Sequence, residues 1–148
     1  HARYVHIPDR LCEAGRLGRK TGAGYYRYPE GSQGPQVDEA VHELVAQCRA
    51  EKGVVPRHLS DEEIVRRVLL TIVNEAALLV AESVAERATD VDVVLVNGYG
   101  FPRWEGGPVF WARERGAAAL KEDMGWLAQL CGPGFVAGDM RYLLATEN

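Results

Sequence analysis

A long helical pattern that begins at Ser60 constrains this chain more than any other feature of its sequence. Ser60 precedes an acidic run that ends at Glu63, and serine and glutamate at this spacing form a capping box, in which each side chain accepts a hydrogen bond from the other residue's backbone. Apolar residues then recur at helical spacing: Val65, Val68, Leu69, Ile72, Val73, Ala76, Leu79, Val80 and Val84. We expect a helix over residues 61–87, roughly 40 Å long at about 1.5 Å per residue.

The width of this apolar surface predicts where the helix lies in the fold. Only a narrow stripe of its circumference is polar, and this stripe contains Arg67, Thr71, Asn74, Glu75 and Glu82. A helix with so much apolar surface is surrounded by other elements. We therefore expect a central helix with Leu69, Ile72 and Val73 buried at its middle.

Shorter patterns predict further helices on both sides of the long one. An amphipathic face covers residues 37–48, and others follow within residues 89–96, 109–115, 120–131 and 139–144. We expect Thr89 to cap the helix after the long one, with Asp92 as its capping-box partner, and residues 93–96 to be buried. Asn97-Gly98 predicts a left-handed stop for that helix.

These patterns together predict an all-α fold, with five to six helices around the long central helix and one short extended segment near the N-terminus. The extended segment contains Tyr25, Tyr26 and Tyr28. Because strands and helices do not alternate, a doubly wound sheet is excluded. We divide the chain into a connecting segment rich in glycine and tyrosine, residues 1–35, and a helical domain, residues 36–148.

Charge and composition exclude several classes of function. The 148 residues carry a formal net charge of -4, so the chain lacks the basic field that nucleic acid or an anionic membrane requires. No apolar run approaches the roughly 20 residues of a membrane-spanning helix. The N-terminal residues lack the apolar core of a signal peptide, and the three widely spaced cysteines suggest no disulfide framework. Because the sequence does not begin with Met, we expect a fragment or a processed chain. Because no targeting signal is seen, we expect a cytoplasmic protein of bacterial type.

The sequence contains no complete catalytic or cofactor-binding motif. The stretch that ends at Lys20-Thr21 resembles a P-loop, but Arg19 and Ala14 stand where the phosphate cradle needs glycine. The stretch after Gly98 has Arg103 where a dinucleotide fingerprint needs glycine. No histidine has a carboxylate at a spacing that would orient it, and no His/Cys cluster suggests a metal site. We therefore assign no catalytic, cofactor-binding or metal-ligating residue.

Two polar features are candidate ligand contacts. Asn74 lies in the middle of the long helix, where asparagine is a poor helix former that tertiary contacts usually justify. It either contacts a ligand or neighbouring domain, or belongs to a solvated stripe or an interhelical hydrogen bond. The loop of residues 97–108 is rich in glycine, proline and aromatic residues. It either lines a cleft for an acyl or aromatic group or forms an interhelical corner packed by its aromatic side chains.

Several segments, taken in order, resemble one family. They are residues 18–28 (GRKTGAGYYRY), 60–64 (SDEEI), 73–76 (VNEA), 90–92 (DVD), 97–102 (NGYGFP) and 106–108 (GGP). Their order and spacing resemble the C-terminal region of 3-hydroxyacyl-CoA dehydrogenases, especially in the multifunctional enzymes of fatty-acid β-oxidation. The resemblance covers roughly residues 11–116.

The resemblance implies a parent enzyme in which an NAD-binding Rossmann domain precedes a duplicated helical domain. The parent oxidises a 3-hydroxyacyl-CoA with NAD, and its acid–base residues lie on the Rossmann part. This chain resembles the second helical copy. By resemblance, Asn74 takes the position of a catalytic asparagine of the first copy, in a copy that has lost that duty, and Asn97 is a substrate-contact position. We therefore take Asn97 and Asn74 as candidate substrate-binding residues.

The resemblance also implies partners. They are the N-terminal Rossmann domain and the first helical copy of the same protein, together with the acyl-CoA substrate; NAD would bind the parent and no cofactor would bind this segment. We expect the isolated segment to be inactive and to self-associate through an apolar helical face. Two alternatives stay open: a stand-alone helical protein-interaction module, and an independent acyl-CoA-binding helical domain. Also open are the acyl chain length and whether an enoyl-CoA hydratase domain is fused to the parent.

Overall fold

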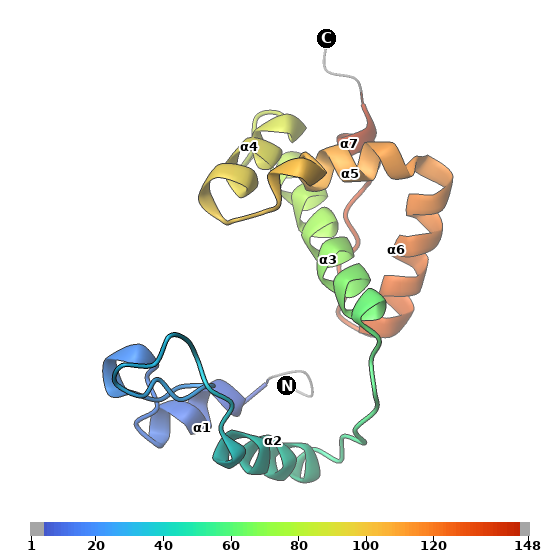
Figure 1. Ribbon diagram of the computed structural model, residues 1–148. Helices are drawn as coiled ribbons and strands as arrows, with labels where there is room; N and C mark the ends of the chain where they lie inside the picture. The colour runs from blue at the N-terminus through green and yellow to red at the C-terminus, as the bar shows by residue number, and fades with distance from the viewer. Residues whose placement is uncertain (1–4, 146–148) are drawn as a thin grey trace. The chain divides into compact units, whose positions relative to one another are not determined.

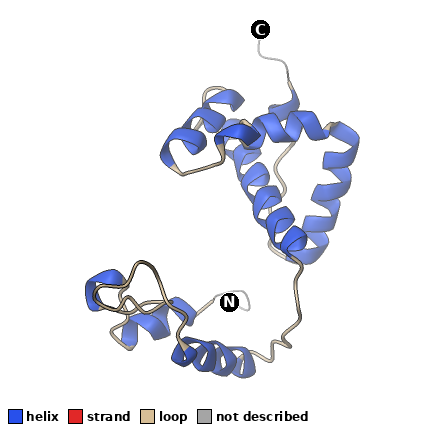
Figure 2. Cartoon of the chain, in the orientation of Figure 1, coloured by secondary structure: helices blue, strands red, loops and turns tan. Residues whose placement is uncertain are grey.

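The computed structural model describes residues 5–145, which divide after His58 into two compact units (Figure 1). Every regular element within these residues is helical, with seven α-helices and two short 3-10 helices (Figure 2). The prediction of an all-α fold is therefore confirmed. The division after His58 falls later than the boundary at residue 35 that composition suggested. None of the described helices has the length and apolar character needed to cross a membrane.

The N-terminal unit contains α1 (Ile7–Glu13) and α2 (Glu39–Glu51), and the loop between them includes a 3-10 helix (Arg19–Thr21). The sequence predicts α2, whose first turn is capped by the carboxylate of Asp38, which accepts a hydrogen bond from a backbone amide. It does not predict α1, because this helix has seven residues and buries only Leu11. An apolar periodicity needs more turns than that to be recognised.

The predicted extended segment around the tyrosines is a loop in the structure. Isolated antiparallel bridges pair Gly18 with Ala23, Ala23 with Arg27, and Arg27 with Gln36. Each bridge joins a single residue pair, so no strand forms in this part of the described chain. The backbone therefore doubles back on itself between α1 and α2 and presents its tyrosines from a compact loop.

The C-terminal unit is built around α3 (Asp61–Ala81), as the sequence predicts. The helices packed around it are α4 (Ala88–Gly98), α5 (Pro108–Arg115), α6 (Ala117–Cys131) and α7 (Arg141–Leu144), with a 3-10 helix (Arg103–Glu105) before α5. Helix α3 contacts all four of these helices, and α5 crosses α3 near the C-terminal end of α3 (Figure 1). The core consists mainly of Leu70, Val73, Ala76, Ala77, Val109, Ala112, Leu120, Leu127 and Leu143.

Helix α3 begins as predicted but ends earlier. The Ser60 hydroxyl accepts a hydrogen bond from the Glu63 amide at 3.2 Å, which confirms the cap. The helix ends at Ala81 rather than near Arg87, because Ser83 takes a left-handed φ of 58°. The amides of Ser83 and the next residue donate to carbonyls of the last turn, which is the Schellman pattern. A left-handed serine is uncommon, so the sequence carries no recognisable stop signal.

Helix α4 differs from its prediction in its N-cap, in the burial of its apolar residues and in the place where it ends. Its N-cap is Arg87, whose backbone amide donates to Asp90, whereas the sequence predicts a cap by Thr89. The expected burial of residues 93–96 is wrong, since Val93 and Val94 are 60% and 53% exposed. A run of four apolar residues spans the whole helix circumference and does not indicate which side faces the core.

The left-handed residue that follows α4 is Gly100, with a φ of 75°, rather than Gly98, which is the last helical residue. The helix therefore continues through Asn97, and the loop to α5 starts later than predicted. Helix α5 runs from Pro108 to Arg115, which agrees to within one residue with the helix predicted over residues 109–115.

Candidate functional site

Asn74, the first candidate substrate-binding residue, is only 5% exposed, although the sequence places it on a polar stripe. Its Nδ2 donates to the Val136 carbonyl at 3.0 Å, and its Oδ1 accepts from the Gly138 amide at 2.8 Å. Gly138 leaves no room for a side chain, because a Cβ there would approach Ala77 Cβ and the Asn74 carbonyl to 2.8 Å. Asn74 therefore holds the segment between α6 and α7 tightly against α3.

Asn97, the second candidate, lies exposed in the last turn of α4. Its Nδ2 donates to the Val93 carbonyl one turn earlier at 2.8 Å, and its Oδ1 accepts from Arg103 Nη2 at 3.2 Å. The Arg103 bond links α4 to the following loop. The side chain is thus exposed, and both of its hydrogen bonds lie at the surface, where a ligand could replace them.

The loop of residues 97–108 is fixed at its far end by Asp92. This buried carboxylate accepts hydrogen bonds from the amides of Val109 at 2.7 Å and Phe110 at 3.0 Å, so it caps α5 from the neighbouring helix. Gly107 has a φ of 117°, and an added Cβ would overlap the Asp92 carboxyl group. The sequence predicts Asp92 as a capping partner within its own helix, because a contact 17 residues away leaves no local pattern.

Two apolar pockets lie on the exposed side of α3. The first, between α3 and α4, is lined mainly by Ile72, Ala76, Leu79, Val84, Val91, Val94, Leu95 and Tyr99. The second is lined mainly by Ile64, Val65, Val68, Leu69, Ile72, Phe101, Pro102 and Trp111. They share Ile72, so we call the two sets together the α3 apolar face. Leu69 and Ile72 are only half-buried, and of the three residues expected at the helix centre, Val73 alone is fully buried.

The charged residues that line these two pockets are all acidic. They are Glu75, Glu86 and Asp90 in the first pocket and Glu105 in the second. An apolar surface with an acidic rim fits another apolar protein surface or a neutral chain, whereas it repels a phosphate-bearing group. The loop aromatics contribute to this face, since Tyr99 and Phe101 each line one pocket, so the cleft interpretation of the loop fits better than a packed corner.

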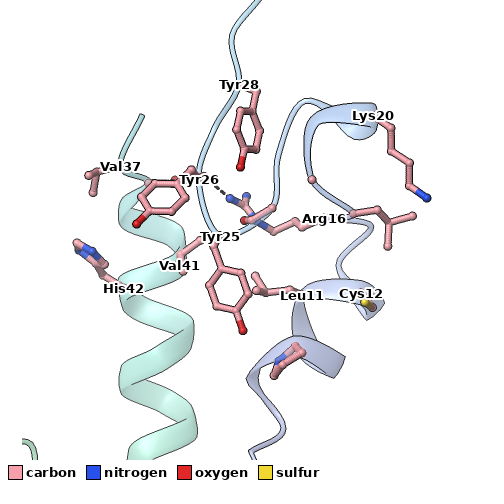
Figure 3. Close-up of a pocket in the computed structure, with 15 residues that line it drawn as sticks. Leu11, Cys12, Arg16, Lys20, Tyr25, Tyr26, Tyr28, Val37, Val41 and His42 are labelled. Carbon is pink, nitrogen blue, oxygen red and sulfur yellow. Dashed lines mark hydrogen bonds and ion pairs between the residues drawn. The ribbon is translucent and has the colours of Figure 1, made fainter. Parts of the chain in front are cut away.

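A third pocket lies in the N-terminal unit between α1 and α2. Leu11 and Val41 come from the two helices, and Tyr25, Tyr26 and Tyr28 come from the loop (Figure 3). Arg16 crosses this pocket and pairs with Asp38 at 2.5 Å, while its Nε donates to the Gly24 carbonyl at 2.9 Å. The hydrogen bond from Arg16 lowers the pKa of Asp38.

The Arg16–Asp38 pair is therefore ionised and already satisfied. It holds the tyrosine loop against the first turn of α2. The geometry around it is that of a structural ion pair under an aromatic loop rather than of an acid–base couple.

A buried charge network stabilises the C-terminal unit. Asp123, on α6, is 1% exposed and accepts hydrogen bonds from Arg66 Nη2 at 2.5 Å and from Arg115 Nε at 2.6 Å. Burial alone raises the pKa of Asp123, but the bonds from Arg115 and Arg66 outweigh it, so the pKa is lowered. The Arg66 guanidinium also lies over the Trp126 ring, 4.2 Å from its centroid. This network joins α3, α5 and α6 and has no apolar pattern that would reveal it in the sequence.

Most of the chain is similar in sequence to known proteins. No family model matches it. It is 37% identical over 121 residues to the peroxisomal bifunctional enzyme of Danio rerio and 37% identical over 123 residues to that of Homo sapiens. It is 33% identical over 134 residues to the peroxisomal fatty acid beta-oxidation multifunctional protein of Oryza sativa subsp. japonica.

These three matches cover 81–88% of this chain but only 17–18% of each relative. The chain therefore corresponds to a short part of much longer enzymes. Over most of its length, it is related to one segment of the peroxisomal bifunctional and multifunctional enzymes of fatty-acid β-oxidation.

Proposed function

We propose that this chain is the second, C-terminal helical copy of an NAD-dependent 3-hydroxyacyl-CoA dehydrogenase of fatty-acid β-oxidation. It acts there as a scaffold that packs against the rest of the enzyme. The observation that carries the proposal is the α3 apolar face. On it, Val65 and Val68 are 62% and 56% exposed in the middle of a helix. A contiguous apolar surface of this kind marks an interface.

The share of the relatives that the chain covers supports a partner within the same polypeptide. Because it matches only 17–18% of their length, a large remainder of the same polypeptide is available to cover this face. The resemblance identifies that remainder as the Rossmann domain and the first helical copy. A stand-alone interaction module would also use such a face, but it would not account for identity to one segment of a longer enzyme.

The acyl-CoA substrate would meet the chain at the loop end of the face. Tyr99 and Phe101 line the two pockets there, and these apolar pockets suit an acyl chain. Asn97 lies near the loop end of α4 and is kept as a contact on the ground of the resemblance alone. The acidic rim does not suit the phosphates of CoA, so the nucleotide end would be held by the rest of the enzyme. The same rim disfavours the alternative of an independent acyl-CoA-binding domain.

NAD is proposed to bind the Rossmann part of the parent enzyme rather than this segment. A Rossmann-type site consists of a strand, a glycine-rich turn and a helix, whereas the described residues 5–145 form helices and isolated bridges. The parent's Rossmann part would therefore hold the cofactor, and the chemical step would occur there. The relatives are named peroxisomal. The sequence predicts a cytoplasmic protein of bacterial type, and we keep the cytoplasmic location as a proposal.

An association experiment tests the scaffold role. The 148-residue chain at micromolar concentration should sediment as a dimer or larger species, because its α3 apolar face lacks its natural cover. Val68→Glu should convert it to a monomer, since a carboxylate would have to lose its hydration on association. Val93→Glu is the matched control, because Val93 is an equally exposed helical valine outside the face. A wild-type chain that sediments as a clean monomer contradicts the proposal.

An activity experiment tests the assignment of chemistry to the parent. The chain alone should form no NADH from 3-hydroxybutyryl-CoA and NAD. In the complete enzyme, Asn97→Ala should raise KM for long-chain acyl-CoA and leave kcat nearly unchanged. The lost binding free energy should be about 0.5–1.5 kcal/mol, the usual contribution of one neutral hydrogen bond. Turnover by the purified chain, or a thousandfold fall in kcat of the variant, would show that this segment takes part in the reaction.

A further inference from the structure

Three side chains with metal-binding chemistry meet where α1 packs on α2. His6 stands at the N-terminal end of α1, and Cys48 and Glu51 lie one turn apart near the C-terminal end of α2. Their imidazole nitrogen, sulfur and carboxylate oxygen all lie within 4.8 Å of one another. His6 Nε2 is already 3.0 Å from Glu51 Oε2. The sequence gives no sign of this group, because His6 and Glu51 are 45 residues apart.

We propose that His6, Cys48 and Glu51 form a binding site for a divalent cation of the zinc class. Thiolate, imidazole and carboxylate are the three ligand types that zinc takes in proteins, and a thiolate selects against magnesium and calcium. Bonds of about 2.0–2.3 Å to a tetrahedral ion require ligand atoms closer together than 4.8 Å. The side chains can close that gap by rotation, because Cys48 and Glu51 share one face of the same helix.

The surroundings of the site define its accessibility. Cys48 is buried, whereas about half of the Glu51 side chain is exposed, so the site is anchored in the core and open on one side. Cys48 and Glu51 both line a small surface pocket together with Glu13, whose carboxylate adds negative potential beside the site. Three protein ligands leave one tetrahedral position, which a water molecule or a ligand from elsewhere can take.

Arg10 competes with a cation for this site. Its Nη2 lies 3.1 Å from each oxygen of Glu51. The Arg10 side chain is 47% exposed, so it can turn into water and release the carboxylate at small cost. The guanidinium and the metal ion are therefore alternative partners of Glu51, and a variant without the guanidinium should bind the metal more tightly.

Zinc titration of the reduced, metal-free 148-residue chain against a chromogenic chelator tests the site. We expect one zinc ion per chain, with affinity that falls as the pH is lowered because the ligands bind deprotonated. Cys48→Ser, His6→Asn and Glu51→Gln should each weaken binding at least about tenfold, and Arg10→Gln should strengthen it several-fold. Cobalt(II) should give a thiolate-to-metal charge-transfer band that Cys48→Ser abolishes.

Matched controls separate this site from adventitious binding. Cys12→Ser removes an exposed cysteine of the same unit, and His42→Asn removes a histidine outside the cluster; neither should change the zinc affinity. Because Cys48 is buried, the Cys48→Ser variant can unfold the unit, and circular dichroism detects this. The variant Glu51→Gln changes a surface residue, so it tests the site without that risk. Two results overturn the proposal: no zinc bound at one equivalent, or zinc binding that Glu51→Gln and His6→Asn leave unchanged. In either case the group is only an ion-pair cluster that joins α1 to α2.

Discussion

Replacement of Asp123 by asparagine should be among the most damaging conservative changes in this chain. The carboxylate is buried and bonded to two guanidinium groups, with distances of 2.5 Å to Arg66 and 2.6 Å to Arg115. Removal of one partner of a buried ion pair typically costs about 3–5 kcal/mol. Both arginines are about 40% exposed and can regain water, so we expect the lower end, about 3 kcal/mol. For a unit of this size that is a fall in Tm of roughly 12–24 °C.

The pH dependence provides an independent check of the same reasoning. Because the folded pKa of Asp123 is lowered, its contribution to stability is fully present above the ordinary aspartate pKa of about 3.9 and is lost as the pH falls through the lowered value. The stability difference between wild type and Asp123→Asn should therefore be constant from neutral pH to about pH 5 and shrink below about pH 4.

Denaturant unfolding of the full chain at several pH values measures both quantities. Glu122→Gln, at the exposed neighbouring position, is the control and should change stability by less than about 0.5 kcal/mol. The cost of Asp123→Asn should also fall in an Arg115→Met background, because one of its charge partners is then absent. If Asp123→Asn costs no more than Glu122→Gln at neutral pH, the network is not a source of stability and the reasoning fails.

Two further predictions concern the packing around the candidate residues. Gly107→Ala should destabilise the chain by about 3 kcal/mol, because the residue has a left-handed φ and the added Cβ would overlap Asp92. Gly116 also has a left-handed φ but open space around it, so Gly116→Ala should cost clearly less. Equal shifts in Tm for the two variants would contradict this prediction. Asn74→Ala should cost about 1–3 kcal/mol and speed hydrogen exchange at the Gly138 amide, whereas unchanged exchange there would show that the Asn74 bond does not hold the segment.

The features that sequence analysis predicts correctly are those set by nearby residues. The cap at Ser60, the extent of α5 and the end of α6 at Cys131 depend on backbone groups within one or two turns. The same holds for the central place of α3, which follows from the width of its apolar surface. Each of these needs no knowledge of what lies across the fold.

The end of α3 and the cap of α4 are missed through nearby residues, Ser83 and Arg87, but the errors at the candidate site lie where a distant residue decides the outcome. Asp92 caps α5 rather than its own helix, and Asn74 is buried because the backbone at residues 136–138 crosses it. The sequence predicts that Ile72 is buried, but it is half-buried and lines the α3 apolar face, because the width of an apolar surface does not indicate which part of it the other helices cover. The His6–Cys48–Glu51 group depends on the packing of α1, which the sequence does not predict at all.

The two candidate substrate-binding residues differ in what a ligand would have to displace. At Asn74, both ends of the amide bond the backbone of residues 136–138, and Gly138 is packed too closely to shift. A ligand there would have to displace this segment from α3 and break both of its hydrogen bonds to Asn74, at a cost of about 1–3 kcal/mol for each polar group left unpaired. At Asn97, a ligand would replace only exposed hydrogen bonds, which water can substitute. Asn74 is therefore committed to the fold of this unit, and Asn97 is the candidate that remains accessible for binding.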